Sequence, residues 1–391
     1  MTAQGGHGSE ARPSQLVSAD VFRAAATVLV VVIHTSYWPP RAAVFDTLGL
    51  LSRLAVPAFM VLTGVLLSYR YGGRPPRAGV FLRRRFARSL LPWLAWAPVY
   101  TLFGWFLAGD PRQSVGGIVD FVVWGAGHLW FLLLIPQMYL AYLVWPRRHL
   151  WWWAAAAMAV QTALCVYRLF GPLPPGAPEQ LVLDHGFQLL PFWVGYFAVG
   201  VAAGRSLAGR AEPDRLRPRP LAAAALAAVL SGWLLVGLTY GGAPHGGFQQ
   251  GTGAFLLPQE PLFVLSVAAL VWLVARPLTA RSRTVAATVR VLSDNSLGIY
   301  ILHPMIIWEI GKHIGGLLDP GLPLSLVGFA ILTAGGLAGA TVVSALLAAG
   351  PLATTIGRRR RRTAAPWLRA GSSGSSAGCL HVETAVCPKE P

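Results

Sequence analysis

Charged side chains are scarce in this chain. They make up 12% of its 391 residues, whereas hydrophobic residues make up 54% and the mean hydropathy is +0.54. Soluble domains carry roughly 25% charged residues. This composition excludes an ordinary soluble globular protein and predicts a polytopic membrane protein.

Acidic residues are scarcer than basic ones. The chain has 15 Asp and Glu against 32 Lys and Arg, which gives a formal net charge of +17. Such an excess can serve nucleic-acid binding, but the arginines here gather in the connections between apolar runs, where membrane topology accounts for them. We therefore expect no nucleic-acid partner.

Cysteine is rare as well, with Cys165, Cys379 and Cys387 as the 3 cysteines of the chain. Their spacing fits no metal site, and the last two lie in a segment that we expect in the cytoplasm, where disulfides are disfavoured. The sequence therefore predicts no metal centre.

Apolar runs that approach the length of a membrane span recur along the chain. A spanning helix needs about 20 mostly apolar residues. We expect an all-α, polytopic membrane helix bundle with about ten transmembrane helices. The expected spans lie near residues 21–38, 50–69, 89–108, 129–145, 150–167, 187–204, 221–240, 261–275, 291–310 and 323–349.

Arginines concentrate in every second connection between these runs. The rich connections contain Arg70, Arg74, Arg77, Arg83, Arg84, Arg85 and Arg88, then Arg147 and Arg148, then Arg205, Arg210, Arg215, Arg217 and Arg219, then Arg276, Arg281, Arg283 and Arg290, and finally the run at 358–362. The other connections hold little beyond Arg41, Arg112, Arg168 and Lys312. Because short cytoplasmic loops retain positive charge, this alternation predicts a multi-pass protein of the cell membrane with both termini in the cytoplasm.

The chain divides into three expected parts. Residues 1–19 form a polar cytoplasmic segment, and residues 20–350 form the ten-helix membrane domain. Residues 351–391 form a basic, Gly/Ser-rich cytoplasmic tail, whose composition cannot bury a core and predicts disorder. We expect its basic run to lie against anionic lipid headgroups.

The first apolar run carries two basic side chains, Arg23 and His34. They are separated by about three helical turns, so both project from nearly the same face, about 16 Å apart along the axis. Ionisable groups inside a bilayer are costly and mark functional sites. His34 suits a general base, and Arg23 suits a phosphate ligand. The alternatives are a helix-packing hydrogen bond for His34 and a topological anchor for Arg23.

A second basic pair, Arg85 and Arg88, begins the third expected span one helical turn apart. Two guanidinium groups at that spacing can clamp a phosphate. The alternative is that they are ordinary basic residues at a cytoplasmic helix end, which the topology already requires.

Further polar residues are candidates to line the site. Ser296, Tyr300 and His303 recur on one face of the ninth expected span, and Pro304 invites a kink that opens backbone carbonyls to a cavity. The alternative for His303 is buried packing.

Four more candidates lie nearer the far side of the membrane. His128 and Trp130 can contact a sugar, or form an interfacial aromatic pair. Glu260 and Glu309 can orient a histidine or bind an acceptor hydroxyl, although for both we favour solvent exposure at a loop edge.

These residues stand in phrases that resemble membrane acyltransferase family 3, the multi-pass enzymes that acylate surface glycans and some small molecules. In that family the first span carries an arginine and a histidine with ten residues between them, as Arg23 and His34 stand here. Its third span begins with R-x-x-R, as Arg85-Phe-Ala-Arg88 does.

Three further phrases follow the family's order. They are VPAFMVLTG at 56–64, HLWFL at 128–132 and LSDNSLGIYILHP at 292–304. The resemblance covers residues from about 16 to 350. The chain departs from the commonest form at Thr63, where the family often has serine, and we expect no C-terminal hydrolase-like domain such as some relatives have.

The resemblance implies an O-acyltransferase. Arg85, Arg88 and Arg23 would bind the phosphates of a cytoplasmic acyl-coenzyme A, with acetyl-CoA as the default co-substrate and no permanently bound cofactor. His34 would activate a hydroxyl of a surface glycan, a lipid-linked sugar or a related metabolite, or would relay the acyl group. Direct transfer and a covalent acyl intermediate both stay open.

A membrane transporter or flippase is the main alternative. In that class Arg23, His34 and His303 would form a proton relay or a substrate path. Such proteins often show internal duplication, and the two halves of this sequence show no convincing similarity. A non-catalytic scaffold would leave the intramembrane basic residues without a reason.

Overall fold

The computed structural model describes residues 16–38, 43–72, 76–106, 115–124, 127–170, 185–208, 210–241, 256–318 and 321–358. Within these ranges the regular structure is helical and contains no strand. The expected all-α polytopic bundle is confirmed.

The α-helices follow the apolar runs of the sequence. In chain order they are α1 (Val17–Thr35), α2 (Ala43–Ser52), α3 (Ala55–Tyr71), α4 (Ala78–Phe106), α5 (Val115–Val123), α6 (Phe131–Val144), α7 (Leu150–Phe170), α9 (Val194–Leu207), α10 (Pro218–Gly241), α11 (Glu260–Arg281), α12 (Arg283–Leu318) and α13 (Leu322–Ala349). Short 3-10 helices flank them: η1 (Gly127–Trp130), η2 (Gly186–Gln188), η3 (Leu190–Phe192) and η5 (Pro351–Ile356).

Each expected span falls on one of these helices, but the expected count of ten needs correction. In the described part of the chain, 7 helical segments are long and apolar enough to cross a membrane. The apolar helix α9 has only 14 residues, because 3-10 turns replace its expected beginning. The helices α4 and α12 fall outside this set, although they contain 29 and 36 residues.

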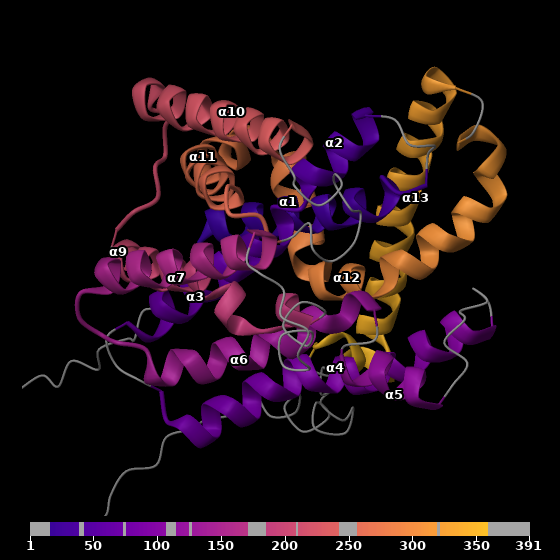
Figure 1. Ribbon diagram of the computed structural model, residues 1–391, viewed down its shortest axis with the longest axis horizontal. Coiled ribbons are helices and arrows are strands. Elements are labelled where there is room, and N and C mark those ends of the chain that lie inside the picture. The colour runs from indigo at the N-terminus through magenta and orange to yellow at the C-terminus, as the bar shows by residue number, and fades with distance from the viewer. Residues whose placement is uncertain are drawn as a thin grey trace, which may run out of the picture.

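Helix α1 lies in the middle of the bundle. Figure 1 shows α10 and α11 along one side of the molecule, α4, α5 and α6 along the opposite side, and α1 between them. Helix α1 packs against α12, α3 and α11, and small residues such as Ala24 and Ala26 are buried in these contacts. The helix that carries Arg23 and His34 is therefore surrounded by other helices, which is the setting that an ionisable group inside a bilayer needs.

Helices α3 and α9 approach each other closely through glycines. A Cβ atom on Gly64 of α3 would overlap the carbonyl oxygen of Phe197, and one on Gly200 or Gly204 of α9 would overlap the backbone of α3. Small residues four apart let two membrane helices bring their backbones together, where packing and not the hydrophobic effect holds them. These glycines fix the position of α3 beside α9.

The residues after α13 continue as part of the bundle. Helix η5 packs against α13 and α4, and its Ala353 and Ile356 are buried. The first residues of the expected disordered tail thus pack against the membrane domain. The rest of that tail, from residue 359, and the segment before residue 16 lie outside the described residues.

Gly200→Ala should destabilise the protein by about 1–3 kcal/mol, because the new methyl group overlaps the carbonyl oxygen of Val61 and the backbones must separate. The matched control is Gly237→Ala on α10, where nothing lies within 4 Å of the added Cβ. That control should be neutral or slightly stabilising, because Ala favours a helix interior over Gly. Thermal unfolding in one detergent measures both, and equal midpoints would contradict the close packing of α3 and α9.

Candidate active site

Three histidines from distant parts of the sequence meet inside the bundle. They are His34 of α1, His128 of η1 and His303 of α12. Their ring centroids are 4.8 Å apart for His34 and His303, 5.6 Å for His128 and His303, and 6.0 Å for His34 and His128. The sequence placed all three among the candidates, and the structure brings them together as one cluster.

The two ring nitrogens of His303 have different surroundings. The side chain has no solvent exposure, and its Nδ1 lies 2.9 Å from the carbonyl oxygen of Ile299. Its other ring nitrogen, Nε2, is buried and has no hydrogen-bond partner among the residues that the structure describes. The same holds for Nε2 of His128. Two buried ring nitrogens at the centre of the bundle are thus available to a bound molecule.

Two tyrosines enclose the cluster. The ring of Tyr100 on α4 lies 4.6 Å from that of His128, and the ring of Tyr300 lies 5.4 Å from it. The Tyr300 hydroxyl donates to the carbonyl oxygen of His128, and the Tyr100 hydroxyl donates to that of Ile301. These bonds hold η1, α4 and α12 around the histidines.

Pro304 contributes to this arrangement. It lies inside α12 and has no backbone N–H, so the carbonyl oxygen of Tyr300 loses its usual helical donor. Ser296, one turn before Tyr300, is half-buried on the same helix.

Arg23, at the other end of α1, is held in a closed triangle of polar side chains. Its Nη1 lies 3.2 Å from Oδ1 of Asp20 and donates to Oγ of Ser293 at 2.9 Å. Ser293 in turn donates to Oδ1 of Asp20 at 2.8 Å. The guanidinium is 27% exposed, so it still faces an opening at this end of the bundle.

Arg85 and Arg88 lie on α4 with different surroundings. The Arg85 guanidinium lies over the rings of Phe81 and Tyr139, at 5.8 and 5.6 Å from their centroids, in cation–π contacts. Arg85 is half-buried and Arg88 is exposed. The aromatic faces hold Arg85 in place without neutralising its charge.

A chain of contacts connects Arg23 with Arg88. Ser293, which binds Arg23, precedes Asp294, whose carbonyl oxygen accepts a hydrogen bond from Arg358. Next to Arg358, an added Cβ on Gly357 would lie 3.2 Å from the carbonyl oxygen of Arg88. The candidate phosphate ligands therefore lie at one end of the bundle.

A comparison with protein families decides the class of this protein. Residues 16–349 match the acyltransferase domain of acyltransferase family 3. The chain belongs to this family. It is therefore a membrane acyltransferase, as the resemblance implied. A search of curated proteins gave no match.

Two candidate residues of this acyltransferase lie away from the histidines. Trp130 packs into an aromatic core, with its ring stacked 5.9 Å from that of Trp193. Glu309 is 59% exposed, as expected, but it lies inside helix α12 and not at a loop edge; it pairs with Lys312 at 2.7 Å and with His313 at 3.3 Å. His128 and Trp130 of η1 have different neighbours: His128 contacts the other histidines, and Trp130 stacks on Trp193.

Glu260 and Arg53 are two further buried ionisable side chains of the acyltransferase. Glu260 is only 2% exposed, so the expectation of solvent exposure was wrong for this residue. Glu260 interacts electrostatically with Arg53, which lies between α2 and α3 and is 1% exposed. Nη2 of Arg53 donates to the hydroxyl of Tyr37 at 2.7 Å, and the Tyr37 ring lies 6.4 Å from that of His34.

Sequence analysis missed Arg53, Tyr37 and Tyr100. A signal for Arg53 existed, because it is a charge inside the apolar run 50–69 and such charges mark functional or paired positions. The tyrosines carry no such signal, since aromatic residues are common in membrane helices.

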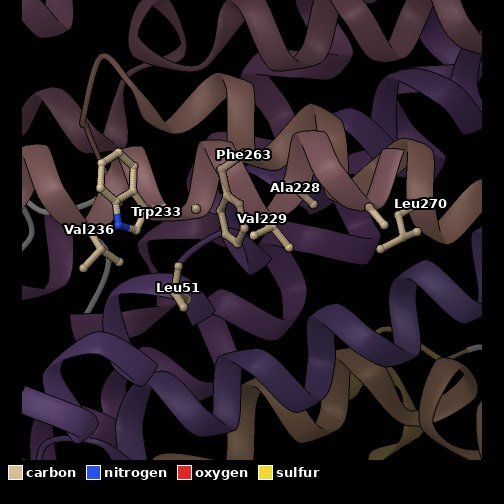
Figure 2. A pocket seen from close by; sticks show the side chains of 9 residues that line it. Leu51, Ala228, Val229, Trp233, Val236, Phe263 and Leu270 are labelled. Atoms are coloured by element: carbon tan, nitrogen blue, oxygen red, sulfur yellow. The ribbon is translucent and has the colours of Figure 1, made fainter. Parts of the chain in front are cut away.

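The acyltransferase also has an apolar pocket of about 490 Å³ between α10, α11 and α2 (Figure 2). Its lining consists of Leu51, Ala225, Ala228, Val229, Gly232, Trp233, Val236, Phe263 and Leu270. None of these side chains can transfer a proton or bind a phosphate. The described residues also contain no group of three or more His, Cys, Asp or Glu that could hold a metal ion.

Arg53→Leu should destabilise the acyltransferase by about 3–5 kcal/mol, because it leaves the Glu260 carboxyl buried without its nearby positive charge. The double variant Arg53→Leu, Glu260→Leu should recover most of that loss. Thermal unfolding of the two single variants and the double variant gives the coupling between the sites. Strictly additive losses would show that Arg53 and Glu260 are independent.

Proposed function

We propose that this protein is an O-acyltransferase of the cell membrane. It moves an acyl group, with acetyl as the first choice, from acyl-CoA in the cytoplasm to a hydroxyl of a surface glycan, a lipid-linked sugar or a related metabolite. The observation that carries this proposal is the placement of His34 in a cluster with His128 and the buried His303, while Arg23, on the same helix, lies at the arginine-bearing end.

His34 is the general base of the proposed reaction. Its ring takes the proton of the acceptor hydroxyl as the hydroxyl oxygen attacks the thioester carbonyl carbon. The bond between that carbon and sulfur then breaks, and His34 returns the proton to the thiolate of coenzyme A. The position of His34 between helices supports this role, because charges that develop where water is scarce interact strongly with fixed neighbours.

Arg85 and Arg88 are the proposed ligands of the donor phosphates. The cation–π contacts of Arg85 position a guanidinium that keeps its full charge for a phosphate. Arg23 is partly compensated by Asp20, so we assign it a secondary contact at the same end. His128, His303, Tyr300 and Ser296 line the reaction site in this proposal.

The orientation follows from the positive-inside rule. The arginine-rich connections, both termini, the segment 1–19 and the tail 351–391 face the cytoplasm, where acyl-CoA is present. The apolar pocket between α10 and α11 lies one helical turn from Glu260 and offers a surface suited to the hydrocarbon chain of a lipid-linked sugar. That feature favours a lipid-linked acceptor among the three classes.

His34→Ala should lower acyl transfer by about 10²–10⁴-fold and leave acetyl-CoA binding largely intact, because it removes a proton acceptor needed in the transition state. Arg85→Ala and Arg88→Ala should instead weaken acetyl-CoA binding by about 1.5–3 kcal/mol each, through the lost phosphate contact. Acetyl-CoA affinity and acyl transfer are measured separately in nanodiscs, with glycans from cells that lack the gene as acceptors.

The matched control is Arg84→Ala, an exposed arginine of the same run, which should bind acetyl-CoA as the wild type does. Near-normal transfer by His34→Ala would remove the proposed base. Substrate movement into vesicles without consumption of acetyl-CoA would favour the transporter alternative.

A further inference from the structure

We propose that His303 is a positioning residue that fixes the tautomer of His34. Its Nε2 accepts a hydrogen bond from one ring N–H of His34, which leaves the other ring nitrogen of His34 free to take the acceptor's proton. This inference rests on the proposed role of His34 as the general base.

The tautomer of His303 follows from its contact with Ile299. A backbone carbonyl oxygen can only accept a hydrogen bond, so the Nδ1 atom that lies 2.9 Å from it must carry the proton. A neutral imidazole has one N–H and one lone pair. The lone pair of His303 is therefore on Nε2, and that atom is an acceptor.

The Nε2 atom of His303 lies fully inside the bundle without a partner among the described residues. Leaving a buried acceptor unpaired costs about 1–3 kcal/mol, so native structures rarely contain one without a reason. A partner that forms its bond during the reaction is such a reason.

His34 is the side chain best placed to be that partner. Of the two other histidines, His34 has the ring that lies closer to His303. The centroids of these two rings are 4.8 Å apart, and their planes meet at 66°. This edge-to-face contact allows ring nitrogens to reach a hydrogen-bond distance of about 3 Å after a small rotation. Catalytic hydrogen bonds are often long in a free enzyme and shorten when substrates bind.

The hydrogen bond would contribute most once His34 has taken the proton. The imidazolium of His34 then donates a charge-assisted hydrogen bond to neutral His303, which is stronger than a hydrogen bond between two neutral imidazoles. The proton itself goes from the acceptor hydroxyl to His34 and then to the coenzyme A thiolate, and His303 neither gains nor loses one. A tautomer-fixing residue of this kind changes the rate of transfer and not the binding of the donor.

The first test compares His303→Leu with His303→Gln in acetyl-CoA consumption, with glycans from cells that lack the gene as acceptors. His303→Leu should lower kcat about 10²-fold or more at an unchanged KM for acetyl-CoA, because it removes the acceptor atom. His303→Gln, whose side-chain oxygen can occupy the place of Nε2, should recover at least about tenfold of that loss. Equal losses in both variants would show that only packing matters at this position.

The second test is a double-mutant cycle with His34→Ala. If His303 acts through His34, His303→Leu should cause no further loss of transfer in the His34→Ala background. A full additional loss there would overturn the inference while leaving the proposed base in place. Wild-type transfer by His34→Ala alone would instead refute the proposed function. His313→Leu, an exposed histidine on the same helix, is the control and should keep normal kcat and thermal stability.

Discussion

The cost of taking polar groups out of water is the constraint on which this structure depends. Inside a bilayer a charged or hydrogen-bonding side chain must find a partner or serve a function. Arg23 is matched by Asp20 and Ser293, and Arg53 donates to the Tyr37 hydroxyl. Nε2 of His128 and Nε2 of His303 are among the buried side-chain atoms that have no hydrogen-bond partner in the described residues, and as imidazole nitrogens they can take up a proton.

Helix α1 connects the two ends of the proposed reaction. Its central position lets Arg23 lie beside α12 at one end and His34 meet η1 and α12 further along. The glycine contact between α3 and α9 and the hydroxyl bonds of Tyr100 and Tyr300 hold the surrounding helices in place. The proposed donor, acyl-CoA, is a long molecule with phosphates toward one end and the thioester at the other. The separation of Arg23 and His34 along α1 suits a donor of this shape.

Apolar length and composition were enough to predict the helical class and where the helices lie along the chain, because both are local properties of the sequence. They could not predict that α9 has a shortened helix, since its 3-10 turns depend on packing around Trp193. His34 and His303 stood out as polar groups in apolar runs. The sequence did not indicate that Glu260 is buried. Its interaction with Arg53 joins segments some two hundred residues apart, and no periodicity in the sequence indicates such a contact.

The most direct measurement is a structure of the full chain in nanodiscs with a non-hydrolysable acetyl-CoA analogue bound. We expect the analogue's phosphates against Arg85 and Arg88 and its acetyl carbon beside the ring of His34, with room for an attacking oxygen at about 3–3.5 Å. An analogue whose phosphates lie at the Glu260 end of the bundle, or whose acetyl group lies away from the three histidines, would contradict it.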